Sequence, residues 1–116
     1  MSEWTIPDGE SASNSIWFGL EAIVSCIAPT MTATTTKLQL QASADPMSVD
    51  DDDADFYDVT VDGTEVKFSV SASAGVADGL ETLVRQRRVR VNAETDAGAS
   101  VNQSGAKVIT PMSIRT

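Results

Sequence analysis

The chain has 116 residues, the size of one ordinary domain, and 41% of them are hydrophobic, enough material for a core. It contains no histidine, which removes the commonest general base and metal ligand, and its single cysteine, Cys26, excludes an internal disulfide and a cysteine-based zinc site. The net charge of −9 argues against nucleic acid binding and favours partners with basic or polar surfaces.

Short stretches of Val, Ile and Thr, separated by Gly, Pro, Asp and Asn, predict strands along the whole chain. Residues 1–9 indicate an extended N-terminal arm without the features of a signal peptide, and no apolar run is long enough to cross a membrane. We predict strands at 15–20 and 22–28, the second apolar on both faces. Residues 37–42 alternate, which predicts that Leu38, Leu40 and Ala42 face the core while Lys37, Gln39 and Gln41 face solvent.

The middle of the chain is expected to contain a polar loop and a hairpin. Residues 46–55 form the loop, which carries a run of aspartates. Residues 56–61 are extended, and Asp62-Gly63 is a hairpin turn signal that leads into a strand at 65–70. Residues 75–83 mix Gly, Leu and Val, which predicts a short strand followed by a helical turn.

The last third is expected to contain two further strands. In residues 84–92 the alternation places Val89 and Val91 inward and Arg88 and Arg90 outward. Residues 107–114 close the chain, and Pro111 within them indicates an edge position or a bulge. We therefore predict one all-β domain over residues 1–116, a jelly-roll-like β-sandwich of about seven or eight short antiparallel strands with extended terminal arms.

The aspartate run is the candidate metal site. Asp51, Asp53 and Asp55 offer the oxygen ligands that calcium prefers, on a loop that can adapt to the ion. The EF-hand pattern of glycine and glutamate is absent, and consecutive aspartates repel one another. A solvated loop without a cation is therefore the alternative interpretation.

The arginines at 85–90 form the only concentrated positive charge in the sequence. Arg87, Arg88 and Arg90 are candidates for docking an acidic partner or a phosphate, since arginine is enriched at interfaces. The alternative is that they pair internally with the abundant carboxylates.

No pattern of catalytic residues is visible, so we expect a binding or structural protein without a cofactor rather than an enzyme. Paired carboxylates for sugar hydrolysis are not singled out among the many acidic residues, and no glycine-rich phosphate loop is present. Cys26 lies in the most apolar predicted strand and is expected to be buried and unreactive.

Several segments, in order along most of the chain, resemble a family of small virion proteins from tailed bacteriophages and related gene-transfer particles. Residues 4–11 match an Ile-Pro-x-Gly-x-Ser opening, and further likeness covers the segments 27–29, 38–45, 56–58, 62–66, 88–91, 101–103 and 108–110. The family usually has Asp-Gly-Gly and an aromatic residue after its Ala-Ser-x-Asp. Here Pro46-Met47-Ser48-Val49 and the aspartates stand there instead, so this loop is longer and more acidic.

The resemblance implies a virion β-sandwich more firmly than a position in the particle. The leading hypothesis is a capsid decoration (cement) protein, made in the host cytoplasm, that binds the major capsid protein on the outer head surface as a homo-oligomer, a trimer by expectation. The alternatives are a neck or tail connector and, from another class, a carbohydrate-binding module. Candidate partner contacts are Trp4 and Ile6 in the arm, unless Trp4 packs on its own sandwich, and Met112 and Ile114, which are placed to join a neighbour's sheet.

Overall fold

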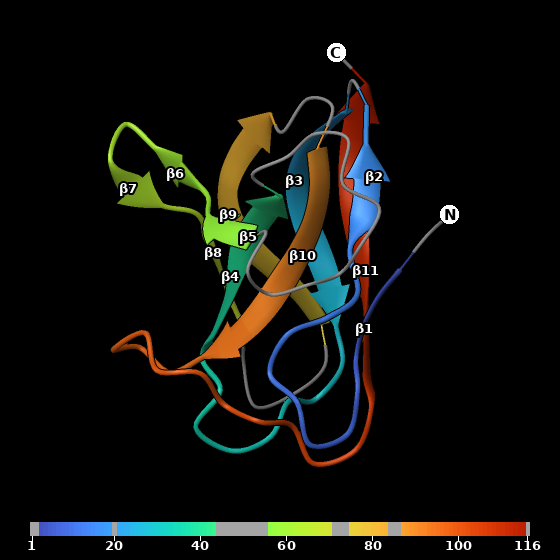
Figure 1. The fold of residues 1–116 in the computed structure, drawn as a ribbon, viewed down its shortest axis with the longest axis vertical. Helices are drawn as coiled ribbons and strands as arrows, with labels where there is room; N and C mark the ends of the chain where they lie inside the picture. The colour runs from blue at the N-terminus through green and yellow to red at the C-terminus, as the bar shows by residue number, and fades with distance from the viewer. Residues whose placement is uncertain (1–2, 20, 44–55, 71–74, 84–86, 116) are drawn as a thin grey trace.

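The computed structural model describes residues 3–19, 21–43, 56–70, 75–83 and 87–115. Figure 1 shows that their regular structure consists of β-strands. The strands are β1 (Trp4–Ile6), β2 (Ile16–Phe18), β3 (Glu21–Ala28), β4 (Lys37–Ser43), β5 (Phe56–Asp58), β6 (Thr60–Val61), β7 (Thr64–Glu65), β8 (Lys67–Ser69), β9 (Gly75–Leu83), β10 (Arg87–Glu94) and β11 (Lys107–Arg115).

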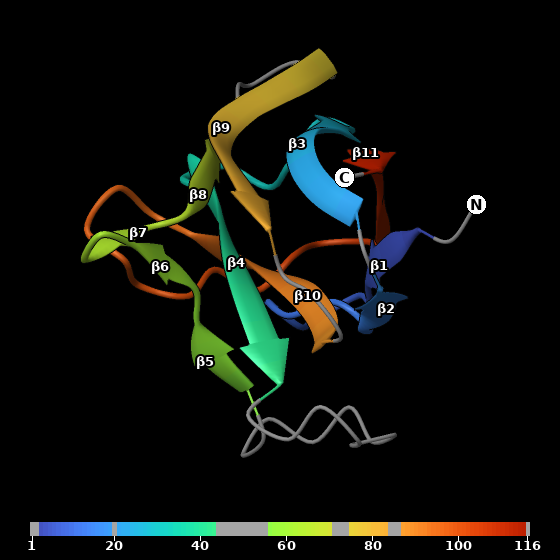
Figure 2. The same ribbon diagram turned by 90° about the horizontal axis from the view of Figure 1, so that it is seen from above.

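One antiparallel sheet of nine strands carries the fold, in the order β1-β11-β3-β9-β8-β4-β10-β2 with β5 beside β4. The sheet curves so that the β1-β11-β3-β9 half faces the β8-β4-β10-β2 half across the core, as in a β-sandwich (Figure 2). The hairpin β6–β7 pairs separately. The prediction of an all-β sandwich is confirmed. The finer jelly-roll order is not confirmed, because pairing runs continuously from one half to the other.

The core follows the alternation of the long strands. In β10, Val89, Val91 and Ala93 are fully buried, as every second residue of a strand that covers a core must be. β4 shows the same pattern at Leu38, Leu40 and Ala42, so the predicted inward residues of both strands are confirmed. The largest fully buried apolar side chains are Trp4, Ile6, Ile23, Leu38, Leu40, Phe68 and Ile109.

Asn14 connects β1, the first strand in the order of the sheet, to the segment before β2, the last strand in that order. The main-chain N–H of Asn14 donates to the carbonyl oxygen of Thr5 (3.3 Å), and its side-chain Oδ1 accepts from the N–H of Thr5 (2.6 Å). Its Nδ2 donates to the carbonyl oxygen of Glu3 (3.3 Å). β1 therefore lies between β11 and the segment that leads into β2, as Figure 2 shows from above.

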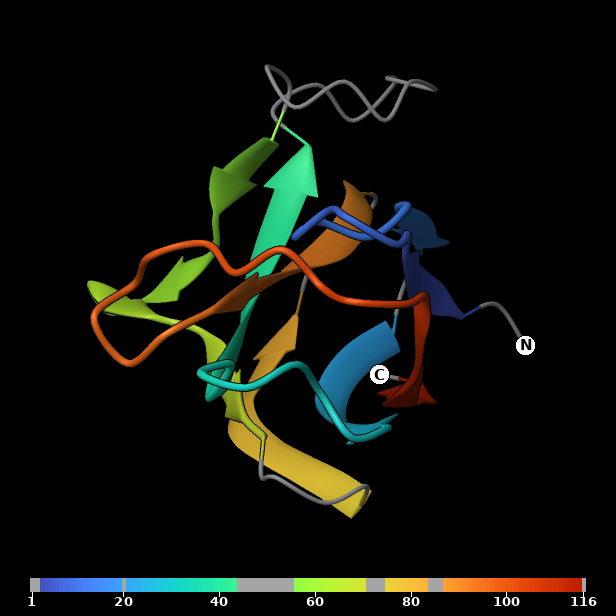
Figure 3. The same cartoon turned by 90° about the horizontal axis from the view of Figure 1, so that it is seen from below.

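Gln103 joins three loops, which Figure 3 shows from below. Its buried side chain accepts a hydrogen bond from the N–H of Thr32 and donates to Thr35 Oγ1, each at 2.9 Å. Its main chain pairs with Gly9 and Glu10. The loop after β1, the loop before β4 and the loop before β11 are thus held together by one residue.

Two turn predictions are confirmed. Asp62 and Gly63 have φ angles of 52° and 81°, both positive, which is the conformation that a two-residue hairpin between twisted strands requires. The register of β11 with β3 shifts between Met112 and Ser113, so the predicted irregularity lies one residue beyond Pro111, with Val24 of β3 as the extra residue.

Other local predictions are wrong. Neither terminal segment is a free arm: β1 pairs with β11 from Trp4↔Ile109 to Ile6↔Lys107, and β11 pairs with β3. Residues 75–83 form one continuous strand, β9, without the expected helical turn, because β3 supplies a long edge to pair with.

Candidate interaction surface

An apolar strip lies on the outer surface of β3 and β11. It consists of Ile27, Val108, Met112 and Ile114, whose exposed fractions are 48%, 46%, 39% and 50%. We call these four residues the β3–β11 face. Single exposed apolar residues are ordinary, but a group on adjoining strands is a feature of interaction sites.

The strand register brings these side chains together. Thr110 pairs with Ile27, and Met112 pairs with Ser25, so Ile27 is the diagonal neighbour of Met112 across the two strands. Val108 precedes Thr110 by two residues and lies on the same side of β11. The hydroxyl of Ser25 donates to Met112 Sδ at 3.2 Å, which holds that side chain over β3.

Consecutive residues at the end of β11 are exposed. Met112, Ser113 and Ile114 are all exposed, although a regular strand would turn every second side chain to the core. The register shift places the extra residue, Val24, on β3, so Met112 and Ile114 remain two residues apart on one side of β11. Met112 and Ile114 were predicted as partner contacts, and their exposure agrees with that prediction without testing it.

Exposed charge on the described residues is acidic. The described charged side chains in the exposed class are Glu3, Asp8, Glu10, Asp58, Asp62, Glu65 and Asp96. The cationic side chains whose burial is described, from Lys37 to Lys107, are all buried or half-buried. The exposed charged side chains of the described residues are therefore negative rather than positive.

The prediction that Trp4 and Ile6 are exposed contacts is wrong. Both have no exposed surface. The Trp4 ring lies 6.1 Å from that of Phe18, and its Nε1 donates to the carbonyl oxygen of Val89 at 2.9 Å. A tryptophan in a chain with few aromatics contributes more to the domain's own core than to an exposed position, so the alternative interpretation for Trp4 holds.

The arginines do not form an exposed patch among the described side chains. Arg90 is only 6% exposed: its Nε donates to Gln41 Oε1 at 2.8 Å, and its guanidinium lies 4.2 Å from the centre of the Phe56 ring. Arg88 is half-buried and donates to the hydroxyl and carbonyl oxygens of Ser15. The predicted docking role is therefore wrong for Arg90 and weakened for Arg88. The side chain of Arg87 lies outside the described part of the structure.

The candidate metal ligands Asp51, Asp53 and Asp55, with the whole loop 46–55, lie outside the described residues. Within the described ranges, no group of three or more Cys, Asp or Glu side chains is arranged to hold a metal ion. The calcium hypothesis thus stays a prediction for the loop alone.

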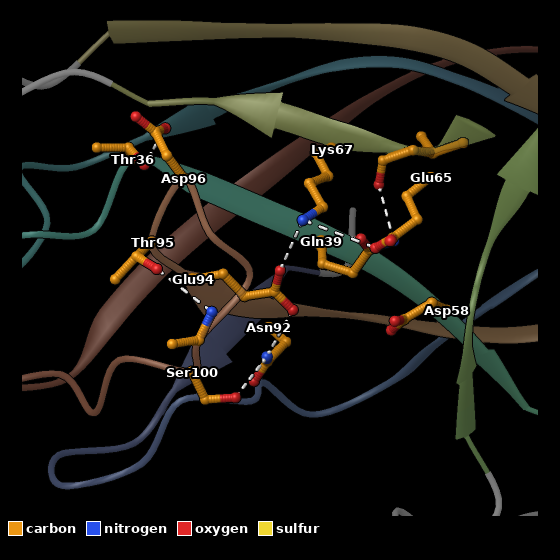
Figure 4. Close-up of polar contacts among 12 residues, drawn as sticks. Thr36, Gln39, Asp58, Glu65, Lys67, Asn92, Glu94, Thr95, Asp96 and Ser100 are labelled. Carbon is orange, nitrogen blue, oxygen red and sulfur yellow. Dashed lines mark hydrogen bonds and ion pairs between the residues drawn. The ribbon is translucent and has the colours of Figure 1, made fainter.

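A polar cluster covers the outer side of β4, β8 and β10 (Figure 4). The Lys67 ammonium lies 3.1 Å from Glu94 Oε1 and 3.6 Å from Glu65 Oε2. Glu94 is only 5% exposed and also accepts a hydrogen bond from Asn92 at 3.0 Å. Burial lowers the pKa of Lys67, but its hydrogen bond and charge interaction with Glu94, with help from Glu65, outweigh this and raise the pKa above its usual value.

Gln39 lies beneath this cluster, and its predicted exposure is wrong. It pairs with Lys67 of β8 on one side and Asn92 of β10 on the other, and it is fully buried. Its Nε2 donates to the carbonyl oxygens of Leu40 and Val66, whereas Oε1 has no hydrogen-bond partner. The Lys67 ammonium already supplies the positive charge of this cluster, so the arrangement indicates a structural ion pair rather than a cation site.

A surface hollow of about 650 Å³ lies beside the segment 9–14 and is also lined by Thr5, Pro7, Arg90 and Asn102. None of its lining residues in the described part of the chain is aromatic. Sugar sites usually offer an aromatic ring for stacking, so this hollow gives no support to the carbohydrate-binding alternative.

Cys26 is fully buried, as predicted. Burial raises the pKa of its thiol to about 12. A thiol that keeps its proton and has no exposed surface is a poor nucleophile, and we therefore assign Cys26 a packing role.

No protein-family model matches the sequence, and no curated protein or solved structure matches it significantly. The described residues contain no helix long and apolar enough to span a membrane.

Val108 and Ile27 were missed as candidate contacts from the sequence. Val108 and Ile27 are next to Ile109 and Cys26, which are buried, so the two members of each pair face opposite sides of their strand. The sequence shows this alternation, but which side meets solvent depends on the order of the strands in the sheet.

Proposed function

We propose that this chain is a structural protein of a tailed-phage virion, a non-catalytic capsid decoration protein that docks on the major capsid protein through the β3–β11 face. The observation that carries the proposal is the exposed apolar strip of Ile27, Val108, Met112 and Ile114. An exposed apolar face is compatible with many assemblies. We choose a virion among them because several segments of the chain resemble small virion proteins.

Docking through this face stabilises a particle by burying apolar surface. Removing the rest of a half-exposed isoleucine from water contributes roughly 1 kcal/mol, so four such residues form a modest hot spot for each copy. Many copies that bind the assembled shell but not free subunits shift the equilibrium toward the assembled state by mass action.

The exposed acidic side chains support a partner with a basic or polar rim around its apolar contact. Like-charged surfaces repel, and a chain with a net charge of −9 is selective for partners of opposite sign. With β1 part of the domain's own sheet and core, the β3–β11 face replaces the N-terminal segment as the proposed anchor.

The copy number of the chain in purified virions of the phage that encodes it tests this position, by quantitative mass spectrometry against the major capsid protein. We expect a stoichiometry near one copy per capsid subunit. A count on the order of one ring would instead assign the chain to the neck or tail. Absence from the virion would refute both.

A further inference from the structure

The exposed side chain of Met112 brings a sulfur atom to the surface of the domain. Met112 is 39% exposed, whereas Met31, the other methionine whose burial is described, is 6% exposed and belongs to the core. A thioether is oxidised at its sulfur, so an oxidant in solution must be able to approach the side chain. In the folded domain, Met112 can therefore meet oxidants that do not reach Met31.

Ser25 determines where this sulfur lies. Ser25 and Met112 are paired across β3 and β11, and the Ser25 hydroxyl donates a hydrogen bond to Met112 Sδ at 3.2 Å. A thioether sulfur is only a weak acceptor. The hydroxyl thus keeps the sulfur on the β3–β11 face while donating to an acceptor weaker than oxygen.

Met112 lies between the other members of the β3–β11 face. Ile27 is its diagonal neighbour on β3, and Val108 lies four residues before it on the same side of β11. Ile114 follows it by two residues on that side. A polar group at Met112 would therefore divide the apolar strip into two parts.

We propose that Met112 is a redox-sensitive modification site, at which a peroxide converts the thioether of the free protein to a sulfoxide and thereby blocks docking through the β3–β11 face. The sulfur attacks one peroxide oxygen, an S–O bond forms and the O–O bond breaks. The second oxygen leaves as hydroxide and takes the proton of the transferred oxygen. Sulfur loses two electrons, and hydrogen peroxide is reduced to water.

The sulfoxide replaces an apolar contact by a polar one. Its oxygen is a stronger acceptor than the thioether sulfur, and the Ser25 hydroxyl already points at this side chain. That hydrogen bond holds the oxygen on the face instead of letting it turn away. An apolar partner surface would have to bury the S–O group, which costs free energy, so docking weakens. The effect on docking rests on the proposed function, whereas the modification itself does not.

Cys26, the other described sulfur near this position, does not compete for the oxidant. It follows Ser25 in β3, but its side chain faces the core and has no exposed surface. Burial also keeps its thiol protonated, with a pKa of about 12. Oxidation at Met112 therefore changes the surface of the domain without opening its core.

Brief treatment of the purified full-length protein with hydrogen peroxide tests the modification without a virion or a variant. Peptide mass spectrometry with fragmentation assigns the sulfoxide to individual methionines. We expect Met112 to be oxidised about tenfold or more faster than Met31, because Met31 is reached only when the domain opens. Equal rates at the two residues in the folded protein would overturn the inference.

Retention on a hydrophobic column measures the consequence for the face. Met112→Leu keeps an apolar side chain of similar size and cannot form a sulfoxide. It still contains Met1, Met31 and Met47, so it controls for oxidation elsewhere in the chain. We expect peroxide to shorten the retention of the parent protein and to leave that of Met112→Leu unchanged. An equal shift in both proteins would contradict the assignment to Met112.

Rebinding to virions from which this chain has been removed tests the effect on docking. We expect the oxidised parent protein to bind about tenfold or more weakly, and peroxide-treated Met112→Leu to bind as the untreated variant does. Undiminished binding of the oxidised parent would overturn the inferred block of docking. Failure of the untreated parent to bind would refute the proposed function instead, since the oxidation rates and the column retention decide the modification site on their own.

Discussion

The indole Nε1 of Trp4 donates a hydrogen bond to the carbonyl oxygen of Val89, 2.9 Å away, across a sequence separation of 85 residues. This bond joins the first strand of the chain to β10 in the opposite half of the sheet. The N-terminal segment is therefore part of the structure that holds the two halves together, and residues 1–9 cannot be deleted without exposing the core.

Replacement of Trp4 by phenylalanine tests this bond. The variant loses the donor and leaves the Val89 carbonyl oxygen buried without it, so we expect the free energy of unfolding to fall by about 2–4 kcal/mol, counting the smaller ring. Urea unfolding measures the change. The matched control is Trp17→Phe, at an exposed position, which should change stability by less than about 0.5 kcal/mol. An equal effect of the two substitutions would contradict the assigned role of Trp4.

The ion pair of Lys67 and Glu94 gives a second prediction. Lys67→Met leaves the Glu94 carboxylate buried with Asn92 as its remaining described partner, and we expect a loss of about 1–3 kcal/mol. Glu65→Gln removes the longer and more exposed contact of the same ammonium and should cost less than about 0.5 kcal/mol. If Glu65→Gln were the more damaging change, Glu94 would not be the main partner of Lys67.

The raised pKa of Lys67 also predicts a pH dependence. The native state holds this proton more tightly than the unfolded chain does, so the contribution is fully present below the usual pKa of 10.5 and is lost as the pH rises through the native value. The stability difference between the parent protein and Lys67→Met should therefore be smaller at strongly alkaline pH than at pH 8, as measured by urea unfolding at each pH. A difference that grows with pH would refute the pairing.

The buried thiol of Cys26 predicts slow chemical labelling. With a pKa of about 12 and no exposed surface, it should react with a thiol reagent at pH 8 only when the domain opens. The labelling rate is then expected to rise in Trp4→Phe by about tenfold for each 1.4 kcal/mol of lost stability. Rapid labelling of the folded parent protein would show that Cys26 is accessible.

Alternation in the sequence was enough to predict much of β4 and β10. Their inward residues, from Leu38 to Ala42 and at Val89 and Val91, are buried as expected, since period-two patterns report which face meets a core. The Asp62-Gly63 turn and the irregularity at Pro111 were also predicted, because these residue types have strong local conformational preferences.

What the sequence did not predict depends on contacts between distant segments. Gln39 alternates like a solvent-facing residue, but Lys67 and Asn92 on the two neighbouring strands bury it. Trp4 was expected to be an exposed anchor, because the sequence alone does not show that β11 and Val89 lie beside it. The candidate face was predicted only in part, at Met112 and Ile114, since Ile27 and Val108 join them through the β3–β11 register alone.

Retention of Ile114→Asp on purified virions tests the proposed docking face most directly. Half of this side chain is exposed in the free protein, so the substitution should change stability by no more than about 1 kcal/mol while weakening a docking contact about thirtyfold or more. Val61→Asp introduces the same charge at an exposed position of the β6–β7 hairpin, away from the face, and serves as the matched control. We expect Ile114→Asp to be lost from the particles and Val61→Asp to be retained. Full retention of a folded Ile114→Asp variant would contradict docking through the β3–β11 face.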